Sequence, residues 1–266
     1  RPGGIVLPES VKVISHTSIN HAITEISEGH LSSLQAFLDH FLSLGNRLLN
    51  YPAFRRRALN TGILTQQEAL RVGARGLTAR ASGLMHYDFR LNHPYGIYEI
   101  RPDLRRIIIE TEPERREQLL RSQELRGDVY ARTHLRILEV KASVEIVHSL
   151  LTQLGITVLN APLYSPIEPA LQSVHNFTFA FDYAEGWRGT VVYWLMKDKF
   201  GHIYRCQVCD PSIFNWVALK TAVEPRQLDN DYVQQHDPPH KYAKMDVADF
   251  PLHKKSINPS PAANDR

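Results

Sequence analysis

Two stretches of the chain place apolar residues three or four positions apart, which is the spacing of one face of an α-helix. In the first stretch this pattern runs over residues 19–48, and Pro52 cannot continue the helix. The second stretch starts at Asp128, whose negative charge suits a helix start, and its apolar face runs over residues 131–154 before Gly155. The sequence therefore predicts two long helices.

A shorter helix is indicated between the two long ones. Thr65 and Glu68 have the spacing of a capping box, in which each side chain binds a free backbone amide, and Gly73 is a suitable end. The following residues 74–103 are rich in Gly, Pro, Tyr, Arg and His and show no sustained period. We expect an ordered loop there, because disordered segments carry fewer aromatic residues.

The periodicity changes in the last third of the chain. Residues 177–181 alternate between apolar and other positions, and two further runs, 191–196 and 202–208, flank a short segment that contains Gly201. This arrangement is typical of a β-hairpin. A short helix over residues 212–222 is expected after it.

These elements predict a mainly α fold with a small β-hairpin. Residues 1–224 are expected to form a single domain, and residues 225–266, which are polar and rich in proline, an extended or partly disordered C-terminal tail. No run approaches about 18 apolar residues, so no transmembrane helix is predicted, and no signal peptide is visible. Because the sequence starts with Arg1, we expect the domain to be truncated at its N-terminus.

Composition narrows the class of protein only a little. The 266 residues are 43% hydrophobic and 22% charged, which is ordinary for a soluble globular protein. The net charge of +3 gives no indication of nucleic-acid binding. The two cysteines, Cys206 and Cys209, provide no disulfide framework and favour a reducing compartment.

Cys206 and Cys209 have the spacing that can bring two thiolates onto one metal atom. A zinc or nickel site needs more ligands and the sequence has no second cysteine pair, so a structural role is the preferred interpretation. A metal-binding enzyme that also uses nearby histidines stays open as an alternative. No Ser–His–Asp arrangement is recognisable, and no glycine-rich loop follows a strand, so a Rossmann-type NAD site is not predicted.

The loop over residues 75–90 is the most distinctive segment. It combines glycines, which permit tight turns, with arginines, which can bind carboxylates or lie near a negatively charged cofactor. Two interpretations stay open. Either the loop lines an interface or a site, or its Arg and Asp residues tie two helices together.

Two segments of the first half of the chain are especially informative, Gly76–Arg90 with its Arg-x-Ser-Gly and Asp-x-Arg patterns, and Gly127–Arg132. They resemble the loop and the following helix start of the 49-kDa-type subunit of respiratory complex I, a member of the hydrogenase large subunit family. Further segments that carry this resemblance are Arg1–Gly4, Asn60–Leu70, Pro94, Tyr95, Tyr98, Arg136 and Glu139. The second half is similar to the membrane-bound, hydrogenase-related branch in Glu185–Gly189, Tyr193, Trp194, Tyr204, Arg205, Asp210–Ser212, Asp249–Leu252 and Lys255–Asn258.

The resemblance implies a hydrogenase-large-subunit-like helical core, of which this chain is expected to be the C-terminal part. It implies a peripheral subunit on the cytoplasmic or matrix face of an energy-converting membrane, with an iron–sulfur small subunit and membrane-arm subunits as partners. In complex I this subunit and the iron–sulfur small subunit together shape the quinone cavity, whereas hydrogenases hold nickel and iron between two cysteine pairs of the large subunit. The C-terminal end of this chain has no cysteine, so we predict no nickel and no cofactor bound by the chain itself. An iron–sulfur cluster is expected on the partner, with a quinone as the candidate ligand of the cavity.

The predicted function is a subunit of a membrane-associated electron-transfer complex, of the NADH:quinone oxidoreductase or hydrogenase-related type, rather than an enzyme alone. The residues expected to shape the wall facing the partner's cluster or a quinone cavity, all by positioning, are Arg80, Ser82, Asp88, Arg90, Asp128 and Arg132. No catalytic residue and no metal ligand is assigned. The alternatives are a non-catalytic scaffold subunit of such a complex, or a metal-binding enzyme using Cys206 and Cys209.

Overall fold

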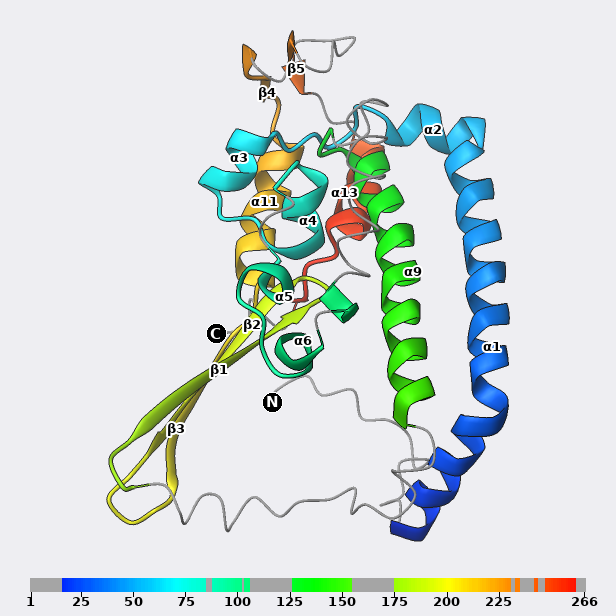
Figure 1. Cartoon of the computed structure of the whole chain (residues 1–266). Helices are drawn as coiled ribbons and strands as arrows, with labels where there is room; N and C mark the ends of the chain where they lie inside the picture. Colours follow the sequence, from blue (N-terminus) through cyan, green and yellow to red (C-terminus); the bar gives the residue numbers. More distant parts are fainter. Residues whose placement is uncertain are drawn as a thin grey trace.

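The computed structural model describes most of the chain and shows a helical body with a small sheet extending from it (Figure 1). The described residues are 16–84, 88–101, 103–105, 126–154, 175–230, 233–234, 242–243 and 247–261. Within these residues no helix is long and apolar enough to cross a membrane.

The two predicted long helices are confirmed, and they lie side by side (Figure 1). Helix α1 spans His16–Asn50 and helix α9 spans Val129–Leu154. Leu49 packs in one cluster with Ile137 of α9. Close approach requires a small residue at Gly45, because an added Cβ there would lie only 3.0 Å from Ile137 Cδ1.

The segment after α1 turns the chain toward the centre of the molecule. Pro52 does not continue α1 but opens a separate helix, α2 (Pro52–Ala58), where its missing amide proton costs no helical hydrogen bond. Helix α3 (Gln66–Arg71) begins with the predicted capping box, since Thr65 and Glu68 each bind the other's backbone amide. Gly73, with a φ of +67°, follows its end.

The segment predicted as a loop is partly helical, so that prediction needs correction. It contains α4 (Gly76–Ala81), α5 (Phe89–Asn92) and α6 (Ile97–Ile100). Every residue of α4 is buried, so no polar face exists to give the helix a visible period. The other two are single turns of four residues, too short to show one.

The predicted hairpin is present and gains a third strand. Strands β1 (Phe179–Gly186), β2 (Gly189–Lys197) and β3 (Ile203–Cys209) form an antiparallel sheet in the order β1-β2-β3. A two-residue turn joins β1 to β2, because Gly186 pairs directly with Gly189. The end of the sheet that carries this turn meets the helical body, and the opposite end points away from it (Figure 1).

Helix α11 (Ser212–Val223), predicted over 212–222, packs among α3, α4 and α13. The region beyond residue 224 contains the short strands β4 (Arg226–Gln227) and β5 (Tyr242–Ala243), the 3-10 turn η2 (Val247–Asp249) and helix α13 (Phe250–Ile257). We predicted an extended or partly disordered tail there. Residues 250–257 are instead helical, because Pro251 suits a first turn and Ile257 reaches the core. The proposed division into a domain and a tail stays a prediction.

Candidate functional site

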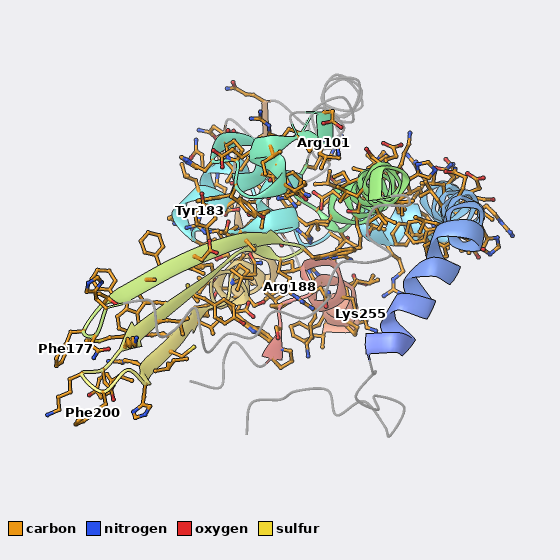
Figure 2. All side chains as sticks on the ribbon, turned by 60° about the horizontal axis from the view of Figure 1, so that its bottom comes forward. Arg101, Phe177, Tyr183, Arg188, Phe200 and Lys255 are labelled. Atoms are coloured by element: carbon orange, nitrogen blue, oxygen red, sulfur yellow. The ribbon has the colours of Figure 1, made fainter. Side chains whose placement is uncertain are left out.

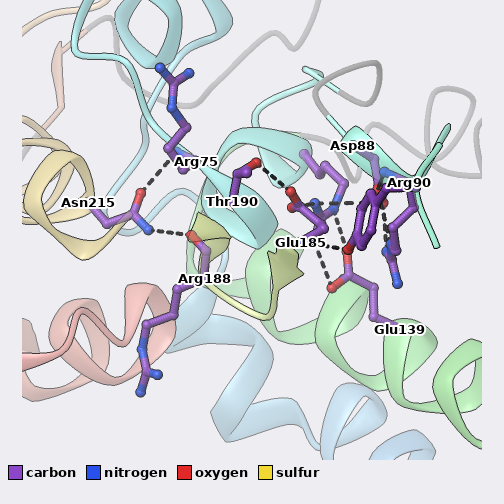
Figure 3. A network of polar contacts seen from close by, with 10 residues as sticks. Arg75, Asp88, Arg90, Glu139, Glu185, Arg188, Thr190 and Asn215 are labelled. Carbon is purple, nitrogen blue, oxygen red and sulfur yellow. Dashed lines mark hydrogen bonds and ion pairs between the residues drawn. The ribbon is translucent and has the colours of Figure 1, made fainter. Parts of the chain in front are cut away.

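A buried network of charged side chains lies where α4, α5, α9 and the turn end of the β1–β2 pair meet (Figure 3). Arg80 of α4 is its centre, with only 3% of its side chain exposed. Its Nε and Nη2 donate to the two carboxylate oxygens of Glu139 on α9, at 2.6 and 3.0 Å. Its Nη1 donates to Glu185 Oε1 of β1 at 3.3 Å. One guanidinium therefore joins three elements that are far apart in the sequence.

Asp88 and Arg90 complete this network from the start of α5. Arg90 donates from Nε and Nη2 to the two oxygens of Asp88, at 3.0 and 2.6 Å, and its backbone amide also donates to Asp88 Oδ1. Asp88 thereby caps α5, and its Oδ2 lies 4.0 Å from Arg80 Nη1. The arginine–aspartate pair is thus held against Arg80 rather than facing solvent.

The charges of the network shift one another's ionisation. Burial alone would raise the pKa of Asp88, but its bonds to Arg90 and the charge of Arg80 outweigh burial and lower that pKa. The pKa of Glu185 is raised because burial is not outweighed by Thr190 and Arg80. Arg80 has a raised pKa despite its burial, because Glu139, Asp88 and Glu185 surround it. The arginines are therefore permanently charged, whereas the pKa values of Asp88 and Glu185 are shifted in opposite directions.

A second buried network lies at the start of α9, apart from the first. Asp128 accepts from the backbone amides of Ala131 and Asn60, both at 2.8 Å, and so caps α9 and holds the segment after α2. Fully buried Arg132 donates to the carbonyls of Gly127 and Gly62. Its Nε donates to Ser256 Oγ of α13 at 2.9 Å, so this network ties the end of the described chain to α9.

His253 of α13 is buried beside this second network. Both of its ring nitrogens lack a hydrogen-bond partner among the described residues. Burial, with the charge of Arg132 as a second cause, lowers the pKa of His253 from 6.5 to about 4. The imidazole packs against Gly62, where an added Cβ would lie 2.1 Å from its Nδ1. His253 is therefore a neutral packing residue at neutral pH.

The six predicted site residues thus fall into two networks rather than one wall. Arg80, Asp88 and Arg90 are together in the first network, and Asp128 and Arg132 in the second. Ser82 joins neither by a side-chain bond: its Oγ donates to the carbonyl of Thr78, at the close approach between α4 and Gly127. Five of the six side chains are buried within the chain. Their role as a wall toward a partner stays a prediction.

Sequence reasoning did not assign two residues that the first network requires, Glu139 and Glu185. Glu139 lies seven positions after Arg132, which places both on one face of α9, and this spacing was a usable signal. Glu185 gave no such signal, because nothing in its strand shows which helix the strand meets. Both residues were among those on which the family resemblance rests, but the sequence analysis assigned no role to them.

The two cysteines do not form a pair in space. They are three residues apart on β3, and side chains at odd spacings along a strand point to opposite faces of the sheet. Within the described ranges, no group of three or more His, Cys, Asp or Glu side chains is arranged to hold a metal ion. A nickel–iron centre needs converging thiolates, which Cys206 and Cys209 do not supply. The same geometry weighs against a metal-binding enzyme built on these two residues.

Comparison with known proteins places this helical scaffold and its buried arginine networks in a defined class. Residues 19–235 match the family described as "Respiratory-chain NADH dehydrogenase, 49 Kd subunit". The chain belongs to this family, and the matched range contains both networks except for the α13 residues.

Among curated relatives, the D subunit of the NADH-quinone oxidoreductase of Clostridium beijerinckii is 26% identical over 195 residues, covering 72% of this chain and 46% of the relative. A D subunit of the NADH-quinone oxidoreductase of Herpetosiphon aurantiacus is 28% identical over 202 residues, covering 74% and 47%. The chain therefore spans about half the length of the curated relatives that it matches.

A solved structure shares the fold. It is a chain of the membrane-bound sulfane sulfur reductase, an archaeal respiratory membrane complex, with a TM-score of 0.57 and 21% identity. The match covers 93% of this chain and 55% of the other. The mainly helical fold with a small β-sheet that was predicted from the sequence is thereby confirmed.

Proposed function

We propose that this chain is a subunit of a membrane-associated respiratory complex, in which it packs against an iron–sulfur small subunit and helps to shape a quinone or other redox cavity. The observation that carries this proposal is the family match over residues 19–235. That range includes all six residues singled out from the sequence and also Glu139 and Glu185.

In this function the two buried networks hold the helices and loops that would face the small subunit, and do not themselves contact it. Arg80 fixes α4 against α9 and the sheet, and Arg132 fixes the start of α9 against α13. A buried ion pair of this kind fixes one arrangement of elements, since each lost partner leaves an uncompensated charge. The loops between these elements then have defined positions toward a partner.

The proposal includes cofactors only on the partner side. The iron–sulfur cluster belongs to the small subunit, a quinone is the candidate ligand of the shared cavity, and this chain binds no nickel. The chain sits peripherally on the cytoplasmic or matrix face, beside membrane-arm subunits. The placement of Cys206 and Cys209 on opposite faces of β3 supports the nickel-free part of the proposal.

The test is affinity purification of the tagged full chain from membranes of cells that express it. Mass spectrometry identifies partners, and metal analysis of the same sample counts iron and nickel. We expect an iron–sulfur small subunit and membrane-arm proteins, with iron and without nickel. Purification of the chain without those partners, or stoichiometric nickel, would overturn the proposal.

A matched pair of variants connects the test to the site. Arg80→Gln removes the charge at the centre of the buried network, whereas Arg71→Gln removes an exposed charge on α3. We expect Arg80→Gln to reduce quinone reduction by the purified complex and Arg71→Gln to leave it unchanged. If both variants reduced quinone as fast as the unchanged complex, the chain would instead be a non-catalytic scaffold.

A further inference from the structure

The network around Arg80 is unbalanced in charge. The side chains joined by its hydrogen bonds and close ion pairs are three carboxylates, Asp88, Glu139 and Glu185, and two guanidiniums, Arg80 and Arg90. With all of these ionised, one negative charge remains in this set, and the further cation beside it, Arg136 of α9, compensates Glu139. An uncompensated buried charge is costly, and a carboxylate in that position takes up a proton instead.

The contacts indicate which carboxylate carries the excess. Asp88 is held by two side-chain bonds from Arg90, and Glu139 by two from Arg80. Glu185 has one longer contact to a guanidinium, at 3.3 Å, and its side chain is only 1% exposed. Glu185 therefore combines the weakest compensation of the three with nearly complete burial.

The second oxygen of Glu185 has a neutral partner that accepts or donates a proton. Thr190 Oγ1 of β2 lies 2.6 Å from Glu185 Oε2, and a hydroxyl can act in either direction. Thr190 is partly exposed, so it connects the buried carboxyl to the outside of the sheet. The backbone amide of Glu185 donates to the Tyr95 hydroxyl at 2.6 Å, which fixes the position of the strand.

We propose that Glu185 is the proton-binding group of this network and exchanges its proton with solvent through the hydroxyl of Thr190. On release, the proton leaves Glu185 Oε2 for Thr190 Oγ1 while the hydroxyl proton of Thr190 passes to water. The resulting carboxylate binds Arg80 more strongly and competes with Glu139 for it. No electron moves and no other bond breaks. The inference goes beyond the proposed function and does not depend on it.

The groups facing Glu185 come from every element packed around it. Arg80 faces it from α4, Asp88 and Arg90 from the start of α5, and Tyr95 from the segment before α6. Burial is the largest effect on Glu185 and raises its pKa; Asp88 acts in the same direction, and Thr190, Arg80 and Arg90 in the opposite one. The pKa of Glu185 is therefore raised, which agrees with Glu185 as the carboxyl that binds the proton.

The experiment is an infrared titration of the neutral carboxyl band on the full chain, in whatever complex it is purified. In the unchanged protein a carboxyl band should persist above the pH at which ordinary glutamates ionise, which is about 4.3. Glu185→Gln should remove a one-proton component of that band and leave any contribution of Asp128, whose pKa burial also raises. The partly exposed control Glu145→Gln on α9 should leave the band unchanged. An unchanged band in Glu185→Gln, or the absence of the band from the unchanged protein, would overturn the assignment.

Two further variants test the charge balance and the relay. Glu139→Gln frees Arg80 for Glu185, so the band should titrate at lower pH than in the unchanged protein. Thr190→Val should keep the band. After transfer to heavy water, the carboxyl proton should exchange for deuterium several-fold more slowly, as followed by the shift of the band. If Glu139→Gln leaves the titration where it was, charge imbalance is not the cause. If Thr190→Val exchanges at the original rate, Thr190 is not the relay.

Loss of partners during purification would contradict the proposed function and leave these infrared measurements valid.

Discussion

The two ends of the β1–β2 pair share the same strand pairing but differ in burial and in their contacts with the helices. At the turn, Glu185 enters the buried network, and Asn215 of α11 accepts from the Arg75 amide and donates to the Arg188 carbonyl. At the opposite end, Phe179 and Phe181 are each about two-thirds exposed, and Figure 2 shows Phe177 and Phe200 at the far tip. One end is fixed by polar bonds to helices, whereas the apolar side chains of the other end are mostly exposed among the described residues.

Pairing between strands therefore does not by itself fix the position of this sheet. The register runs without interruption from Phe179 opposite Met196 to Gly186 opposite Gly189. The anchoring comes from a few contacts at the turn, including Arg136, whose guanidinium lies over Trp187 and donates to carbonyls of α13. Substitutions at the anchored end should therefore cost far more stability than substitutions at the free end.

The largest effect is expected for Arg80→Met. The variant leaves Glu139 and Glu185 without their shared cation, and breaking a buried ion pair typically costs about 3–5 kcal/mol. The free energy of unfolding, measured by denaturant titration, should fall by that order. The triple variant Arg80→Met, Glu139→Gln and Glu185→Gln should recover part of the loss. No recovery would mean that packing of the arginine stem, rather than charge, is what matters.

Gly76→Ala should come next, with a loss of about 2–4 kcal/mol from a strained left-handed backbone and overpacking. Its φ is +55°, and an added Cβ would lie 2.3 Å from the Arg188 carbonyl carbon and the Gly189 amide nitrogen. Gly96→Ala is the control, because Gly96 has a φ of +51° but nothing within 4 Å. Thermal unfolding of both variants separates the cost of the turn contact from that of the backbone angle. Equal losses would contradict anchoring at the turn.

His253 should make the anchored body sensitive to acid. Its pKa is about 4 in the folded chain against 6.5 when free, so the unfolded chain binds a proton more readily. Stability should then fall as pH drops from 6.5 to 4, by at most about 3 kcal/mol below that range. His253→Gln should flatten this part of the stability–pH curve, and the exposed control His175→Gln should not. An unchanged slope in His253→Gln would exclude this histidine as the cause.

The smallest effect is expected at the free end of the sheet. Phe181→Ser removes a side chain that is already in water, and such surface changes usually alter stability by less than about 0.5 kcal/mol. The unfolding temperature should match that of the unchanged chain. A decrease of several degrees would mean that parts of the chain outside the described residues cover this face, and the contrast between the two ends would be lost.

The sequence predicted those elements whose signals are local. The periodicity of α1 and α9, the capping box at Thr65 and the short helix over 212–222 each depend on residues close together in the chain, and all three are confirmed. Helix α4 was missed because its burial on all sides removes the polar face on which periodicity depends. Helix α13 was missed because its polar composition masks the three residues that are buried, His253, Ser256 and Ile257.

The candidate site was predictable only in part, for the same physical reason. Asp88 and Arg90 are two residues apart, so each lies within reach of the other from the local chain alone. The bond from Arg80 to Glu185 joins residues 105 positions apart, and no local pattern indicates which of the many charged residues meets which. That Asp128 and Arg132 belong to a separate network likewise depends on where α13 returns to α9.

The carboxylate of Glu68 combines a local hydrogen bond with a hydrogen bond between distant parts of the chain. Its Oε2 accepts from the Thr65 amide three residues away and from Arg226 Nη2, 158 positions along the chain, at 2.9 and 2.5 Å. The first bond forms within one helical turn, on the time scale of helix growth. The second requires closure of a very long loop, whose entropic cost is larger than that of a local bond. The same carboxylate thus closes one of the shortest loops of the fold and one of the longest.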